Sequence, residues 1–271
     1  MRGNIIAIAT ALALFAVSAA AAAEVRTVPG DTIILNSVNP DKGLSDLVVH
    51  AVAVATAPGE TLTLTGLRIE LMAQDRAVLK REIATDEMVR ETKRLAGAPI
   101  PEFISGQLLN TQSLDGFVGR HVAFAQSATL DPSEALIATR LYFGVDFAPD
   151  TVRFTAFLRD SKGKTETATA SVPVQIYKPA VAYRMPLSGQ WQMQAVPGPQ
   201  SHHRFNPCTE FAVDFFKLGP DGHVARGDGY NAADFYGYGA PVMAAADGTV
   251  AFVIADQVQN RDAFFQKKGE S

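Results

Sequence analysis

The chain has 271 residues, 47% hydrophobic and 19% charged, which fits one or two folded domains and argues against a largely disordered protein. The formal net charge is -4 and no dense run of Lys or Arg occurs, so nucleic-acid binding and attachment to anionic lipid through a basic patch have little support. Cys208 is the only cysteine, which excludes an intrachain disulfide and leaves the core or a bound metal to stabilise the fold.

Residues 1–23 have the form of a cleavable secretory signal peptide. Arg2 provides a positive start, residues 5–17 are an apolar block, and the small-residue run 18–23 ends in three alanines before Glu24. The apolar block is short for a membrane span of about 20 residues, so cleavage near Ala23 is favoured over an uncleaved anchor. We therefore expect an exported protein, periplasmic or extracellular, with no stable membrane insertion after cleavage.

Residues 24–178 predict a mainly β domain of antiparallel sandwich type. Residues 61–71 alternate Thr or charged residues with Leu or Ile, the period of a half-buried strand, and 160–164 have turn composition. Other segments of strand length are 47–54, 141–147, 152–158 and 165–177. Short strands separated by turn signals are typical of a sandwich.

One helical insertion interrupts these strands. A set of residues recurs at helical spacing: Met88, Val89, Thr92, Leu95 and Ala96. Residues 85–87, Thr-Asp-Glu, can cap and favour a helix N-terminus, and Gly97 and Pro99 end the helix. We predict that the helix packs on the sandwich, and a lid over the following domain is the alternative.

Residues 179–271 form the second predicted domain, entered through a linker at 178–186. Past Trp191 the sequence becomes rich in Gly, His, Asp and aromatic residues. Apolar residues 242–246, the pair Asp247-Gly248 and the returning segment 249–254 predict a hairpin with a two-residue turn.

The second domain also contains potential metal ligands. Imidazole nitrogen and carboxylate oxygen both bind zinc, and His202, His203 and Asp214 offer them. Asp214 lies in an apolar strand, between Val213 and Phe215, where a buried carboxylate is costly unless it meets a cation, a metal or several donors. An edge strand with Asp214 pointing outward is the alternative.

The order of these pieces resembles the M23 (lysostaphin-like, LytM-type) family of zinc metallopeptidases. A His precedes an Asp in an Ala-Val-Asp strand, followed by Gly-x-Pro-Val-x-Ala-x-x-Asp-Gly-x-Val at 239–250. The resemblance covers roughly residues 186–255, with 239–250 its most specific part, and implies a partial antiparallel β-sheet domain of the M23 type.

The resemblance also implies chemistry. Zinc in this family is held by one His, one Asp and a second His from a later His-x-His motif, whose other His assists the catalytic water. Carried over, the zinc ligands are His203, with His202 as the alternative, and Asp214. The implied activity is hydrolysis of cross-bridge peptides in cell-wall peptidoglycan, which fits an exported protein.

The sequence departs from the family pattern in two ways. Residues 205–211 lengthen the gap between the His and the Asp. No histidine follows Asp247-Gly248, since His223, in a predicted surface turn, is the last. The third ligand and the catalytic His are therefore missing. We expect the chain as given to bind zinc weakly and to be inactive, as an incomplete sequence of an exported cell-wall endopeptidase.

Two other functions remain open. A non-catalytic M23-like binding or regulatory module of the cell envelope would act through an envelope protein partner, although the retained His203 and Asp214 favour the enzyme. A plain β-sandwich surface protein is the third hypothesis. Among the remaining polar residues, Arg204 faces the site or forms a salt bridge, and His50 and His121 are assigned structural roles.

Overall fold

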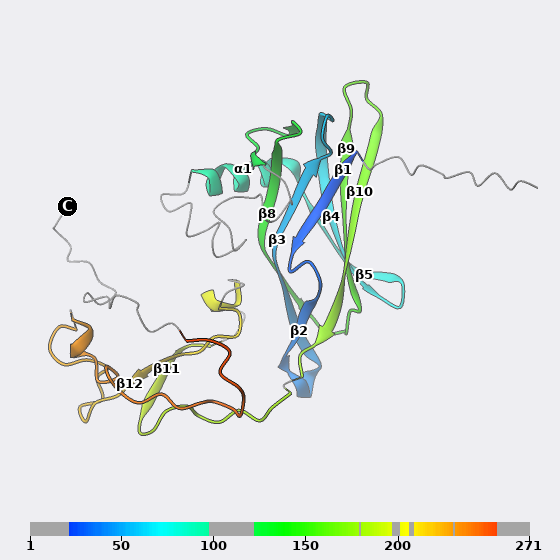
Figure 1. Cartoon of the computed structure of the whole chain (residues 1–271). Helices are drawn as coiled ribbons and strands as arrows, with labels where there is room; N and C mark the ends of the chain where they lie inside the picture. Colours follow the sequence, from blue (N-terminus) through cyan, green and yellow to red (C-terminus); the bar gives the residue numbers. More distant parts are fainter. Residues whose placement is uncertain are drawn as a thin grey trace, which may run out of the picture.

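The computed structural model describes residues 22–97, 122–178, 180–196, 201–205, 209–229 and 231–253, without the side chain of His202 (Figure 1). These residues are mainly β, which confirms the predicted fold class. Most of the predicted signal peptide, residues 1–21, lies outside the described residues, as do His121 and Cys208. Within the described ranges, no helix is long and apolar enough to cross a membrane.

Ten strands of the first predicted domain form one sheet. They are β1 (Ala23–Val28), β2 (Ile33–Asn39), β3 (Leu44–Thr56), β4 (Leu62–Ala73), β5 (Arg76–Ile83), β6 (Ala123–Phe124), β7 (Thr129–Leu130), β8 (Glu134–Val145), β9 (Thr151–Arg159) and β10 (Thr165–Ile176). Their order is β5-β4-β9-β10-β2-β3-β8-β6, with β1 beside β3 and β7 beside β4. A short 3-10 helix, η1 (Pro40–Lys42), joins β2 to β3.

The sheet is mixed, which corrects the expectation of a purely antiparallel sandwich. β10 runs parallel to β2, and β6 runs parallel to β8. β10 runs antiparallel to β9 on one side and parallel to β2 on the other, so the parallel pairing is where the two parts of the sheet join. The predicted strands at 47–54, 61–71, 152–158 and 165–177 all lie in this sheet.

The core lies inside the curl. Its fully buried side chains come from strands at opposite ends of the order, such as Leu67 of β4, Phe154 of β9 and Val49 of β3. Burial of such side chains is the main favourable contribution to folding, worth about 1.5–3 kcal/mol for each. The apolar residues that alternate along the predicted strand 61–71 therefore do face the core inside the curl.

Strand β3 is covered on both faces, which explains its unbroken apolar sequence. Side chains in the main core are Leu47 and Val49 in its first half, but Val52 and Val54 in its second half. The inward face thus switches from odd to even residues near His50. On the neighbouring strand β8 the same switch occurs at Arg140, whose φ of 56° lies in the left-handed region. Every residue of β3 from Asp46 onward is buried.

The predicted helix is α1 (Thr85–Ala96), and it packs on the sheet rather than over the second domain. Its buried residues Met88, Thr92 and Leu95 lie against the main core and against a smaller cluster containing Ala53 and Ile137. α1 therefore covers the outer face of the second half of β3 and the neighbouring part of β8. This finding removes the lid alternative.

Thr92 ties α1 to β8. Its hydroxyl donates to the carbonyl oxygen of Met88 at 2.7 Å and accepts the backbone N–H of Ile137 at 2.9 Å, both in the buried interior. Thr92→Val removes the acceptor, so the Ile137 N–H is left buried without this bond. We expect the free energy of unfolding, measured by urea denaturation, to fall by about 1–3 kcal/mol. Thr92→Ser keeps the hydroxyl and should lose less, and equal losses in the two variants would contradict this role.

The C-terminal segment contains a second, two-stranded sheet. It is formed by β11 (Trp191–Ala195) and β12 (Asp214–Lys217), which run antiparallel. Between and after them lie the 3-10 helices η2 (His202–Phe205) and η3 (Ala232–Asp234). β12 begins at Asp214, so the predicted placement of this carboxylate in a strand is confirmed.

The predicted hairpin at 242–254 is wrong over its described part, because residues 241–253 contain no strand. Neither Asp247 nor Gly248 has the positive φ that the predicted turn requires. The segment bonds instead to the linker: the Met243 N–H donates to the Pro186 carbonyl at 2.7 Å, and the Arg184 N–H donates to the Ala245 carbonyl at 2.8 Å. A hairpin without a covered face is marginal by itself, so these contacts decide the local structure.

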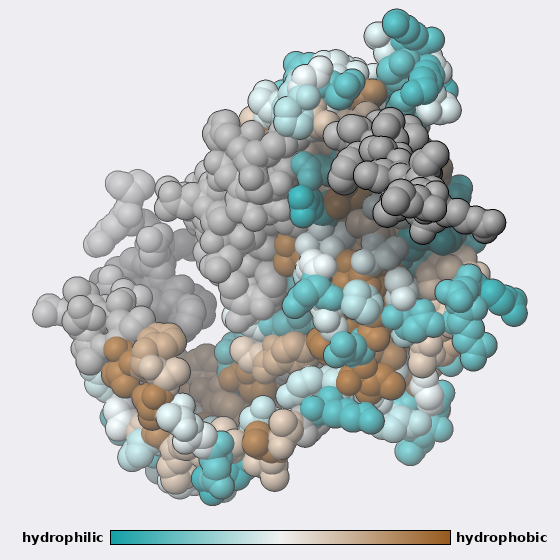
Figure 2. All heavy atoms as spheres, turned by 45° about the vertical axis from the view of Figure 1, so that its right-hand side comes forward, coloured by the Kyte–Doolittle hydropathy of each residue, from teal (hydrophilic) through white to brown (hydrophobic). Residues whose placement is uncertain are grey.

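Large apolar side chains of the C-terminal segment stay at the surface. The most exposed are Val242, Val250, Phe252 and Val253, each with about three quarters or more of its surface accessible. Figure 2 shows apolar atoms, in brown, reaching the surface in the lower part of the molecule. The described part of this segment thus has far fewer buried apolar residues than the ten-stranded sheet.

Candidate functional site

The structure brings together the two residues predicted to bind metal. Nε2 of His203, in η2, lies 3.2 Å from Oδ2 of Asp214, the first residue of β12. The imidazole is buried, with 5% of its side chain exposed, while the carboxylate is 46% exposed. The His203 imidazole is therefore desolvated, whereas the Asp214 carboxylate faces solvent.

A backbone contact fixes the tautomer of His203. Its Nδ1 lies 2.9 Å from the carbonyl oxygen of Ala212, and because a carbonyl only accepts, Nδ1 carries a proton. In the neutral ring Nε2 would then present a lone pair to the Asp214 carboxylate. Two acceptors at this distance repel each other unless a cation lies between them, either a proton on Nε2 or a metal ion.

The donor set fits two positions of a zinc site. Zinc binds imidazole nitrogen and carboxylate oxygen at about 2.0–2.2 Å, so two ligand atoms of a tetrahedral site lie about 3.3 Å apart. The Nε2–Oδ2 separation of 3.2 Å in His203 and Asp214 matches this edge. A hydrogen bond from the second ring nitrogen to a backbone carbonyl is also the usual support of a metal-bound histidine. Within the described ranges, no group of three His, Cys, Asp or Glu side chains is arranged so that it could hold a metal ion.

A groove adjoins the exposed side of Asp214. It encloses about 900 Å³ and has mostly apolar walls from β11, β12 and the loops that follow. Trp191, Phe216 and Phe235 contribute aromatic side chains, and Lys217 adds a positive charge. Because Asp214 is itself part of the wall, a ligand in the groove would lie beside the carboxylate.

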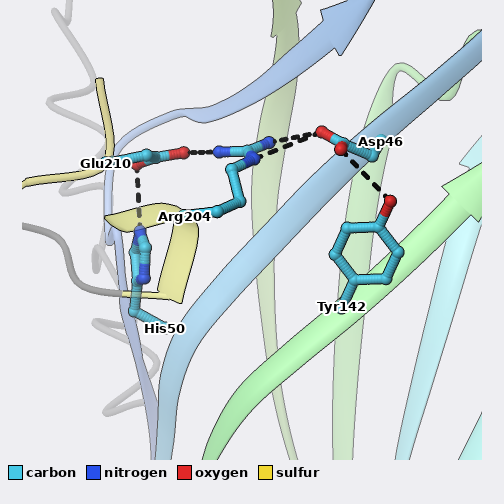
Figure 3. Close-up of polar contacts among 5 residues, drawn as sticks. All are labelled: Asp46, His50, Tyr142, Arg204 and Glu210. Atoms are coloured by element: carbon cyan, nitrogen blue, oxygen red, sulfur yellow. Dashed lines mark hydrogen bonds and ion pairs between the residues drawn. The ribbon is translucent and has the colours of Figure 1, made fainter. Parts of the chain in front are cut away.

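Arg204, next to His203 in sequence, is the centre of a buried charge cluster (Figure 3). Its Nη2 donates to Oδ1 of Asp46 at 2.7 Å and its Nη1 donates to the Glu210 carboxylate. Oε2 of Glu210 contacts Nε2 of His50 at 3.0 Å, and the Tyr142 hydroxyl donates to Oδ2 of Asp46 at 3.2 Å. The side chains of Arg204 and Asp46 are both 0% exposed.

Burial shifts two groups of this cluster. Loss of water around the ring lowers the pKa of His50 to about 4, with the positive charge of Arg204 adding to the effect. His50 is therefore neutral at pH 7 and donates Nε2–H to Glu210. Burial, together with the nearby Asp46 carboxylate, raises the pKa of Tyr142 to about 12. The cluster at pH 7 holds one cation, Arg204, between two carboxylates.

These positions decide between the sequence alternatives. Arg204 forms a salt bridge and does not face Asp214, and His50 has the expected structural role. His223 lies exposed in a turn, where its N–H donates to the Asp221 side chain at 3.1 Å. Asp46 and Glu210 were not predicted from the sequence. The available signal for Asp46 was weak: this carboxylate directly precedes the apolar run 47–54, with Ser45 on its other side.

Comparison with known proteins gives no match: no protein-family model matches the chain, and neither does any curated protein.

Proposed function

We propose that residues 179–271 are part of an exported zinc metalloendopeptidase of the M23 type, which acts on peptidoglycan cross-bridge peptides. The observation that supports this proposal is the contact of His203 with Asp214, 3.2 Å between Nε2 and Oδ2, beside an open groove. The resemblance in sequence names the same two residues as zinc ligands. No histidine follows His223 in the sequence, so we expect zinc binding but no peptide hydrolysis from this chain.

Each group at the site has a definite task in this proposal. His203 and Asp214 would hold the metal, and zinc when bound lowers the pKa of a water molecule and polarises a carbonyl oxygen. The Ala212 carbonyl orients the imidazole by accepting the Nδ1 proton. The mostly apolar walls of the groove suit the side chains of an extended peptide better than a small ion, and a peptide bound there would lie beside Asp214.

Zinc binding to the full chain tests this proposal. We expect weak binding of one Zn²⁺ per chain in equilibrium dialysis. His203→Ala and Asp214→Ala should each reduce the affinity at least about tenfold, since each removes one donor. Affinity should also fall as the pH is lowered, because protons compete with the metal for Nε2.

His223→Ala is the matched control, because it removes an exposed histidine of the same segment. Its zinc affinity should equal that of the unchanged chain. Equal loss in His203→Ala and His223→Ala would mean adventitious binding by surface histidines. No zinc uptake at all would favour the non-catalytic binding module of the cell envelope, whose ligand would then occupy the groove without chemistry.

A further inference from the structure

We propose that Asp46 is a positioning residue for the candidate zinc site, acting through Arg204 on His203; this inference rests on the function proposed above. Asp46 lies in β3 of the ten-stranded sheet, and Arg204 lies 158 residues later, in η2. Figure 3 shows the Asp46 carboxylate and the Arg204 guanidinium facing each other. The first sheet thereby determines where η2 is held.

The contact is strong enough to fix a backbone. Both Nε and Nη2 of Arg204 donate to Oδ1 of Asp46, at 3.2 and 2.7 Å, and neither side chain is exposed to water. A buried guanidinium must keep its acceptors, because each lost partner leaves a desolvated charge. Displacement of η2 away from β3 would therefore be costly, because it would break these buried contacts.

The connection from Arg204 to the metal ligand is short. His203 precedes Arg204 within the single turn of η2, and Ser201 accepts both backbone N–H groups, His203 N with Oγ at 3.2 Å and Arg204 N with its carbonyl oxygen at 3.1 Å. With the Arg204 side chain fixed on one side of this turn, the His203 ring is directed to the other side, toward Asp214.

A second connection leads to the same imidazole. Arg204 also donates to Glu210, which contacts His50 of β3 at 3.0 Å. Two residues after Glu210, the Ala212 N–H donates to the Thr209 carbonyl at 2.8 Å, and the Ala212 carbonyl accepts the His203 Nδ1 proton. The charge cluster thus holds Arg204, the residue after His203, and Glu210, which lies two residues before the carbonyl that orients the His203 ring.

The site needs this outside support. Asp214 begins a strand of four residues, and its sheet has two strands in the described part of the chain. A two-stranded sheet with a partly exposed face is only marginally stable alone. A metal site requires ligands held to within about 0.5 Å, so the rigid ten-stranded sheet is the element that can provide the precision.

The test measures two properties of the full chain carrying Asp46→Asn: Zn²⁺ affinity and the NMR signal of the His203 Nδ1 proton, which the bond to Ala212 protects from exchange. We expect the affinity to fall roughly ten- to hundredfold, as for other residues that orient a metal ligand. We expect the Nδ1 proton signal to be lost. Asp46→Glu, which keeps the charge, should recover part of the affinity.

Glu70→Gln is the matched control. Glu70 is another buried carboxylate of the same sheet, paired with Arg153 of β9 at 2.8 Å and with Lys80 of β5 at 3.4 Å. Its substitution should leave both measurements unchanged. An Asp46→Asn protein that keeps both properties, or a Glu70→Gln protein that loses them equally, would overturn the positioning role. A third outcome separates the two proposals. If the unchanged chain binds no zinc but shows the Nδ1 proton signal, and only Asp46→Asn loses that signal, the zinc proposal is overturned. The role of Asp46 in positioning His203 would then stand.

Discussion

Replacing Arg204 by methionine is expected to lower the free energy of unfolding by about 3–5 kcal/mol. Methionine fills much of the volume of the arginine stem, so the loss comes from charge and not from a cavity. The buried Asp46 carboxylate would retain only one hydrogen-bond donor of the cluster, the Tyr142 hydroxyl. The Glu210 carboxylate would retain its contact with His50. Urea denaturation at pH 7, followed by circular dichroism and by the fluorescence of Trp191, the sole tryptophan, measures the effect.

Arg184→Met provides the control for this prediction. Arg184 also pairs with a carboxylate, that of Asp247 at 3.0 Å, but the two side chains are 65% and 98% exposed. An exposed pair contributes about 0–1 kcal/mol, so its removal should change little. Similar losses in the two variants would show that Arg204 is solvated in solution, contrary to its burial in the structure.

Acidification is expected to cost up to about 3 kcal/mol of stability through His50 alone. Its pKa falls from 6.5 to about 4 on folding, and each pKa unit corresponds to about 1.4 kcal/mol. The unfolded chain binds a proton at this residue below pH 6.5, and the folded chain binds it only near pH 4. The contribution is therefore fully present above pH 6.5 and is lost as the pH falls toward 4.

His50→Gln isolates this contribution. The glutamine amide can donate to Glu210 in place of Nε2–H but does not titrate, so stability should depend less steeply on pH between 6.5 and 4. His223→Gln, at an exposed turn, should keep the steep dependence of the unchanged chain. Parallel curves for the unchanged chain and His50→Gln would contradict the assignment of this loss to His50.

The fold could be predicted from sequence where a segment has one buried face. The alternation at 61–71 gave β4, and the helical spacing from Met88 to Leu95 gave α1. β5 has alternating burial too, yet its inward positions are mostly half-buried and its sequence, from Arg76 to Ile83, is rich in charge, so it has no clear apolar period. The predicted hairpin after Val242 failed because turn composition cannot supply a packing partner.

The candidate site was predictable for a different reason. Asp214 was recognised because a carboxylate between apolar residues needs a partner, and His203 because it belongs to a pattern that names such a partner. Asp46 does not meet the first criterion, because it follows Ser45 at the start of the apolar run, and its partner Arg204 is 158 residues away. A contact of that separation leaves no local pattern in a single sequence.

Because Asp46 and His50 of β3 contact Arg204 and Glu210, the two predicted domains are not independent of each other. A fragment ending at residue 178 would keep all ten strands, and by chain order it would be a complete module. It would also leave Asp46 without its guanidinium and His50 without Glu210. A fragment that keeps these contacts, in evolution or in protein engineering, must therefore contain the first domain, the linker and at least residues 201–214.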